Sequence, residues 1–187
     1  MKTFKIKGFT LVELIATLAI VGLLLSYGAP SLSKLVEDNK ADANIRSFLN
    51  IFSLARSRAV LSSQIVTICP SNDFISCTND WQLPIIVFTD KDNNKAITGT
   101  DKLIHSYPHQ QYEIDIEVHP THKQYFQYSA TGLSHGTPGN IVFCPKSRNM
   151  SHARQVVISF SGRVRVSIDS DHDGLVEDAY GSVLSCS

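Results

Sequence analysis

The stretch that decides the fold is GFTLVELIATLAIVGLLL, Gly8 to Leu25. It belongs to an apolar run from Phe9 to about Tyr27, close to the ~20 residues that a helix needs to cross a bilayer. Lys2, Lys5 and Lys7 precede this run. Because flanking lysines favour the cytoplasmic side, we predict a single N-terminal span with the rest of the chain outside the cytoplasm.

A cleavable secretory signal is the alternative interpretation, and two features argue against it. No A-x-A-like cleavage site follows the run, and Glu13 lies inside it. A carboxylate at membrane depth costs about 2.5–3.5 kcal/mol on insertion scales, so it indicates a function and needs a positive partner. Cleavage between Gly8 and Phe9 would supply the α-amine of Phe9, about one helical turn away in the same chain or in a neighbouring one.

The segment GFTLVELI, Gly8 to Ile15, resembles the N-terminal signature of type IV pilins and type II secretion pseudopilins. The resemblance implies a leader peptide of residues 1–8, removed by a prepilin peptidase that also N-methylates Phe9. It implies that Glu13 is the assembly glutamate and that the partners are other pilin subunits in a helical filament. The expected location is the bacterial inner membrane with the C-terminal domain in the periplasm, and later an extracellular pilus or a periplasmic pseudopilus.

The helical pattern continues beyond the apolar run. From Leu32 to about Ser62, apolar residues recur at three- and four-residue steps with charged residues between them. We therefore predict one helix from Phe9 to about Ser62, with residues 9–30 as the transmembrane or filament-core half and residues 31–62 as an amphipathic half. This helix is expected to bend or melt at three positions: Gly22, Gly28 and Pro30, where many pilins also carry a proline.

After Ser62 the sequence takes on the pattern of β-strands. Eight short segments rich in β-branched and aromatic residues alternate with turn-forming clusters. They are QIVTICP (64–70), LPIIVFTD (83–90), KLIHSYP (102–108), YEIDIEV (112–118), QYFQYS (124–129), NIVFCP (140–145), RQVVISF (154–160) and GRVRVSI (162–168). The prediction is an α+β, pilin-like fold, with one long N-terminal helix packed against antiparallel β-sheets and residues 63–187 forming a β-rich head.

Four cysteines lie in the predicted head: Cys69, Cys77, Cys144 and Cys186. None is in a C-x-x-C pair, so disulfides are favoured over a metal site if the head lies outside the cytoplasm. Of the three connectivities we favour Cys69 with Cys77, which closes a short loop, and Cys144 with Cys186, which would pin the C-terminal tail to a strand. Free thiols are the alternative.

The formal net charge of zero conceals a separation of charge. Between Ile141 and Ile168 every charged residue is basic, and from Asp169 to the end every one is acidic. In a strand, residues two apart share a face, so Arg163 and Arg165 are expected to project together while the intervening valines face the core. The alternative is that these arginines pair with the acids that follow.

Three further basic residues, Lys146, Arg148 and Arg154, are expected to reach the same edge through a hairpin. Guanidinium groups grip phosphates by paired hydrogen bonds, and Gly162 permits a close backbone approach. Up to about five phosphate contacts without a base-reading element predict DNA binding that is weak, salt-sensitive and independent of sequence.

Within the pilin-like proteins, the chain is similar to the GspH/FimT group. The similarity rests on three stretches: NIRSFLNIFSLARSRAVLSSQIVTICP (44–70), Trp81 followed by IIVFTDKDNN (85–94), and ISFSGRVRV (158–166). FimT-type members carry a Gly-Arg-x-Arg element that contributes to DNA binding in natural transformation, and this falls on residues 162–165. The resemblance therefore implies a FimT-like minor pilin, with a GspH-like pseudopilin or an assembly-priming minor pilin without DNA binding as alternatives.

Neither catalysis nor a cofactor is predicted. His119 and His122 have a spacing compatible with metal binding, but no nucleophile, phosphate loop or H-E-x-x-H helix accompanies them. Asp169, Asp171 and Asp173 with the following glycine reproduce the start of a calcium loop, but Tyr180 stands at the twelfth position, where a glutamate would close it. An incomplete acidic loop also occurs at residues 90–101. These are weak calcium candidates, and solvated acidic turns are the favoured interpretation.

Overall fold

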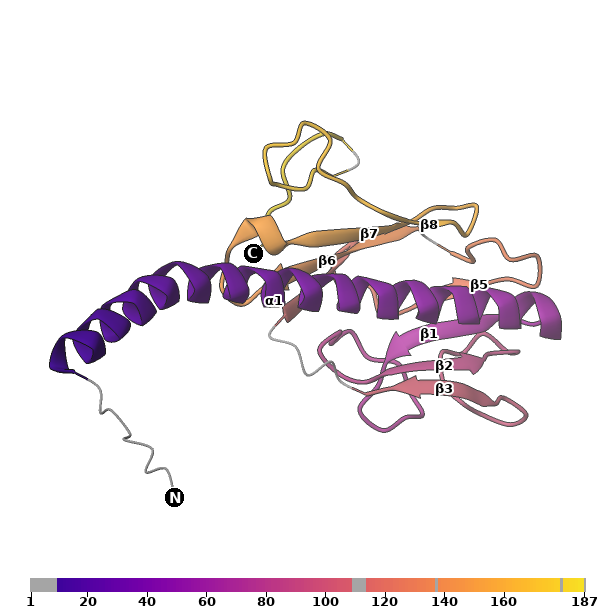
Figure 1. The fold of residues 1–187 in the computed structure, drawn as a ribbon. Helices are drawn as coiled ribbons and strands as arrows, with labels where there is room; N and C mark the ends of the chain where they lie inside the picture. Colours follow the sequence, from indigo (N-terminus) through magenta and orange to yellow (C-terminus); the bar gives the residue numbers. More distant parts are fainter. Residues whose placement is uncertain (1–9, 109–113, 137, 179, 187) are drawn as a thin grey trace, which may run out of the picture. The chain divides into compact units, whose positions relative to one another are not determined.

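The structure is a computed structural model that describes residues 10–108, 114–136, 138–178 and 180–186. One long helix, α1 (Leu11–Ser62), precedes a series of short strands (Figure 1). The strands are β1 (Val66–Pro70), β2 (Ile85–Thr89), β3 (Leu103–Tyr107), β4 (Ile114–His119), β5 (Phe126–Tyr128), β6 (Gly139–Pro145), β7 (Arg154–Ile158) and β8 (Val164–Val166), with a short 3-10 helix, η1 (Met150–His152), before β7.

The chain divides into two compact units, Met1–Asn39 and Lys40–Ser187. In the first unit, α1 begins with a capping box, because Glu13 Oε2 accepts from the Thr10 N–H at 2.9 Å and the Glu13 N–H donates to Thr10 Oγ1 at 3.2 Å. The helical backbone runs on without a break at Gly22, Gly28 or residue 30, so the melting expected there is wrong. By length and composition α1 is able to cross a membrane: its most apolar window has a mean hydropathy of 2.0 and is not buried within the chain.

The second unit, Lys40–Ser187, holds two antiparallel sheets of four strands each. One has the strand order β3-β2-β1-β5 and the other β4-β6-β7-β8. Each of the eight segments predicted as strands overlaps an observed strand, and the predicted class, a helix with antiparallel sheets, is confirmed. The predicted boundaries between leader, helix halves and head remain predictions.

The C-terminal part of α1 shares one core with both sheets. Its apolar stripe includes Phe48 and Phe52, which are fully buried. The Phe48 ring meets Phe143 of β6 edge-on at 4.8 Å, and the Phe52 ring meets Phe126 of β5 at 5.3 Å. From Ala41 to Ala59 the three- and four-residue spacing thus marks the buried face of α1, whereas Leu32, Leu35 and Val36 earlier in the same pattern are exposed.

Both predicted disulfides are confirmed. Cys69 at the end of β1 is bonded to Cys77, and Cys144 of β6 is bonded to Cys186 near the C-terminus. The second bond lies beside a small apolar cluster of Ala153, Val176 and Leu184, which fastens the C-terminal segment to the head.

Candidate nucleic-acid interface and acidic loop

The Gly-Arg-x-Arg element begins in the tight turn between β7 and β8. The Ser159 N–H donates to Arg163 O at 3.0 Å, and the Gly162 N–H donates to Ser159 O at 2.9 Å. Gly162 has φ = 72°, a left-handed conformation that favours glycine. A Cβ at this position would lie 2.3 Å from Gly132 O. Gly162 therefore permits the close backbone approach expected of it, and the backbone that approaches is a neighbouring loop of its own chain.

Two side chains from other elements support this turn. The Tyr128 hydroxyl of β5 donates to Gly162 O at 3.2 Å, and burial raises the pKa of Tyr128 to about 12, against a smaller opposing effect of Arg56. Arg56 Nη2 of α1 donates to Ser161 O at 3.2 Å. Arg56 thus brings a further positive charge to the turn. This contribution was not predicted, because no local sequence pattern connects a helix residue with a turn 105 positions later.

Arg163 and Arg165 are both exposed. The alternating residues Val164 and Val166 pack against the main core. The alternation along this strand is therefore as expected. Arg165 lies opposite Val157 of β7, so it is on the sheet face away from the core. Among the residues that the structure describes, no hydrogen bond or ion pair engages either guanidinium.

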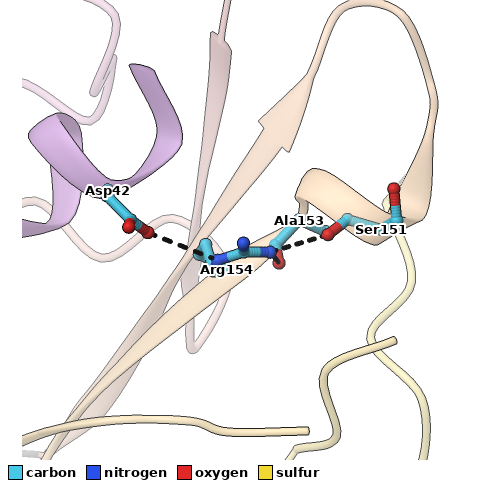
Figure 2. Close-up of polar contacts among 4 residues, drawn as sticks. All are labelled: Asp42, Ser151, Ala153 and Arg154. Carbon is cyan, nitrogen blue, oxygen red and sulfur yellow. Dashed lines mark hydrogen bonds and ion pairs between the residues drawn. The ribbon is translucent and has the colours of Figure 1, made fainter. Parts of the chain in front are cut away.

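Arg154 does not join the other two arginines. On β7 it alternates with Gln155 and shares the core-side face with Val156 and Ile158, so it is on the opposite sheet face from Arg165. Figure 2 shows its guanidinium between Asp42 of α1 and two backbone carbonyls. Nε lies 3.8 Å from Asp42 Oδ1, and Nη1 donates to Ser151 O at 2.7 Å and Ala153 O at 3.0 Å.

Lys146 and Arg148 are exposed but lie at the other end of the β6–β7 hairpin. They follow the end of β6, near the start of β7, whereas Arg163 follows the opposite end of β7. The length of β7, at about 3.3 Å per residue, separates these ends by roughly 13 Å. The expectation that all five basic residues gather at one edge is therefore wrong, because the register places them at two ends and on two faces.

The acids that follow the arginines bond mainly within their own loop. Asp169 accepts from the backbone N–H groups of His172 at 2.7 Å and Gly174 at 2.9 Å. Glu177 Oε2 accepts from the backbone N–H and the hydroxyl of Ser170, both at 2.8 Å, and these two bonds hold the pKa of Glu177 below its usual value. In the described part of the chain, the alternative interpretation, in which these acids pair with Arg163 and Arg165, finds no ion pair to support it. Glu177 and Arg165 do line one shallow hollow on the outer face of the sheet.

One oxygen from each of four carboxylates in this loop lies within 4.8 Å of the other three. They belong to Asp169, Asp171, Asp173 and Glu177. The N–H of Asp173 bonds Asp171 and lowers its pKa, but desolvation and the charges of the other three acids outweigh this, so the pKa of Asp171 lies above its usual value. Sequence analysis singled out three of these residues and missed Glu177, which stands at the ninth position of the loop instead of the twelfth.

In the second acidic loop, Asp90, Asp92 and Asp101 also each place one carboxylate oxygen within 4.8 Å of the other two. Asp90 is fully buried, but its carboxylate accepts from Thr67 Oγ1 at 2.7 Å and Gln127 Nε2 at 3.0 Å, and from the Asn94 N–H at 2.9 Å. The chain's own donors therefore satisfy this carboxylate. His119 and His122 are both exposed.

Of the predicted processing residues, Gly8 and Phe9 lie outside the described residues. Glu13 is described, and its hydrogen bonds to Thr10 close the first turn of α1. The T-x-x-E pattern that produces this cap is present in the sequence, but the sequence analysis considered only a positive partner for Glu13.

A long N-terminal helix whose C-terminal part packs against two antiparallel sheets defines a pilin-like protein, the class that contains minor pilins and pseudopilins. A profile of the family described as "Type II transport protein GspH" matches residues 44–162, so the chain belongs to the GspH family. A prokaryotic N-terminal methylation motif matches residues 3–28. No curated protein sequence matches the chain.

Two solved structures are similar to this chain at low sequence identity. The type IV minor pilin FimU of Pseudomonas aeruginosa is 14% identical with a TM-score of 0.55, and the match covers 72% of this chain and 92% of FimU. The minor pseudopilin EpsH from the type II secretion system of Vibrio cholerae is 15% identical with a TM-score of 0.48, covering 68% of this chain and 95% of EpsH. At this identity the similarity to FimU establishes the fold alone.

Proposed function

We propose that this chain is a FimT-like minor type IV pilin whose head binds extracellular DNA and aids its uptake in natural transformation. The observation that carries the proposal is the pair Arg163 and Arg165. Both are exposed, and among the described residues neither has an acidic partner. Two guanidinium groups, one just before β8 and one on it, with no ion pair to a described residue, are suited to bind phosphate oxygens.

The proposed DNA-binding surface contains few basic residues, so it can make only a small number of phosphate contacts. Arg163, Arg165 and Arg56 supply up to about three phosphate contacts, with Lys146 and Arg148 as outlying contacts on a long duplex. Arg154 is left out because Asp42 and two carbonyls already engage it. Without an element that reads base edges, binding should be non-specific and should weaken steeply with salt.

Maturation and location follow from the N-terminal motif as part of the same proposal. A prepilin peptidase removes residues 1–8 and methylates Phe9, and Glu13 guides assembly with other pilin subunits. Before assembly the chain is a single-pass inner-membrane protein with its head in the periplasm. The long apolar segment of α1 and the match to a methylation motif support this course.

A second candidate is a structural pseudopilin of a type II secretion pseudopilus. The family description favours it, and the family match ends at Gly162, immediately before the two arginines. Membership of the family is therefore no evidence for DNA binding, and that part of the proposal depends on Arg163 and Arg165 alone.

The experiment measures binding of a fluorescent DNA duplex by the full-length chain in a non-ionic detergent at low salt. We expect binding by the wild type and at least a tenfold loss in the double variant Arg163→Gln/Arg165→Gln. The matched control is Lys91→Gln/Lys102→Gln, which removes two exposed positive charges near β2 and β3 and should bind as the wild type does. Absence of binding by the wild type would overturn DNA binding and leave the structural role.

A further inference from the structure

The acidic loop after β8 concentrates four carboxylates, and Arg165 lines the same hollow as Glu177. Asp169, Asp171, Asp173 and Glu177 each place one oxygen within 4.8 Å of the other three. Bringing four such groups together is unfavourable unless something positive or hydrogen-bonding offsets their repulsion. Backbone N–H groups provide part of this compensation.

The order of these residues fits the ligand positions of a calcium loop. Counting Asp169 as position 1, Asp171 and Asp173 occupy positions 3 and 5, a glycine occupies position 6, and Glu177 occupies position 9. The backbone carbonyl of position 7 belongs to Leu175. Only the bidentate glutamate of position 12 is missing, because Tyr180 stands there.

An independent feature points to a ligand. The Glu177 side chain is only 7% exposed, and its two oxygens differ in their surroundings. Oε2 accepts two hydrogen bonds from Ser170, whereas Oε1 is buried and has no hydrogen-bond partner among the described residues. A buried carboxylate oxygen left without a partner carries a desolvation penalty, so a missing cation is the natural partner.

We propose that the loop Asp169–Glu177 binds Ca²⁺ through the four carboxylates, with Glu177 as the buried ligand that the sequence pattern alone does not reveal. Hard oxygen ligands in a flexible loop suit Ca²⁺ better than Mg²⁺, which demands a near-ideal octahedron. With no bidentate ligand at position 12, the affinity should resemble that of extracellular modules, with Kd on the order of 10⁻⁴–10⁻³ M.

The loop at residues 90–101 provides an internal comparison. Its central carboxylate, Asp90, is buried too, but hydroxyl, amide and backbone donors of the chain satisfy it. We therefore assign no ion to that loop. In the loop at residues 90–101, donors of the chain bond the buried carboxylate of Asp90. In the loop at residues 169–177, one buried oxygen of Glu177 has no hydrogen-bond partner among the described residues.

The test uses the full-length chain in detergent, titrated with CaCl₂ or MgCl₂ and followed by calorimetry and thermal unfolding. We expect a Ca²⁺ binding signal and a rise in Tm up to about 10 mM Ca²⁺, above the weak end of the expected Kd range. The response to Mg²⁺ should be smaller. Neither prediction depends on DNA binding.

Two variants locate the site. Glu177→Gln keeps an oxygen for Ser170 but replaces the unpartnered oxygen with an amide. Asp171→Asn removes the charge of an exposed ligand but keeps an oxygen that can accept from the Asp173 N–H. Each should weaken Ca²⁺ binding at least tenfold, whereas the control Asp92→Asn in the other loop should leave it unchanged. No Ca²⁺ response of the wild type at about 10 mM, or an undiminished response in Asp171→Asn and Glu177→Gln, would overturn the proposal.

Discussion

At the residue scale, the Gly-Arg-x-Arg element divides into a structural part and a part available for binding. Gly162 is needed by the fold, since its left-handed backbone and the approach of Gly132 exclude a side chain. Arg163 and Arg165 are exposed and have no side-chain hydrogen bond or ion pair among the described residues, which is why the proposal assigns them to DNA phosphates.

Gly162→Ala should destabilise the head by about 1–3 kcal/mol more than Gly181→Ala. Both glycines have positive φ, of 72° and 82°, so the backbone strain is similar. Only Gly162 has a backbone oxygen in the space that a Cβ would occupy, since nothing lies within 4 Å of a Cβ at Gly181. Thermal unfolding of the two variants measures the difference, and equal Tm values would contradict the account of this turn.

At the element scale, strand register decides which basic residues act together. Period-two alternation in the sequence correctly indicated the common orientation of Arg163 and Arg165. It gave no indication that Arg154 lies on the other sheet face or that the length of β7 separates Arg148 from Arg163, because those facts depend on how β6, β7 and β8 pair. Contacts across long sequence separations, such as Arg56 with Ser161, lie beyond any local pattern.

The two disulfides should contribute unequally to stability. They enclose loops with sequence separations of 8 for Cys69–Cys77 and 42 for Cys144–Cys186. In the chain-entropy description, closing these loops contributes about 2.6 and 4 kcal/mol respectively. Replacing each pair with serine and measuring thermal unfolding should therefore show the larger loss for Cys144–Cys186. A larger loss for the short loop would contradict this order.

At the scale of the whole molecule, the sequence predicted the architecture well because its signals are local and strong. The apolar run, the switch from helical to strand periodicity and the cysteine pattern each correspond to an observed element. The site was predicted less completely. Glu177 was missed as a candidate ligand because the case for it depends on burial and on an unpartnered oxygen, and neither can be read from the spacing of acidic residues.

Processing at the N-terminus can be tested on protein purified from cells that carry a prepilin peptidase. We expect a mature chain that begins at Phe9 and carries one added methyl group, because the predicted leader ends at Gly8 and the matched methylation motif, residues 3–28, spans that position. Intact-mass spectrometry measures both changes. Gly8→Asp, which places a charged side chain at the cleavage site, should leave the leader in place; a mature wild-type chain that begins elsewhere would contradict the assignment.

The central claim is that Arg163 and Arg165 hold DNA phosphates, and the salt dependence of binding tests it most directly. The logarithm of the binding constant against the logarithm of salt concentration should fall with a slope of about −2 to −3 for the wild-type chain. In Arg163→Gln/Arg165→Gln the magnitude of the slope should drop by about 2, because each lost phosphate contact removes close to one unit. The same slope in the wild type and the double variant would contradict the claim.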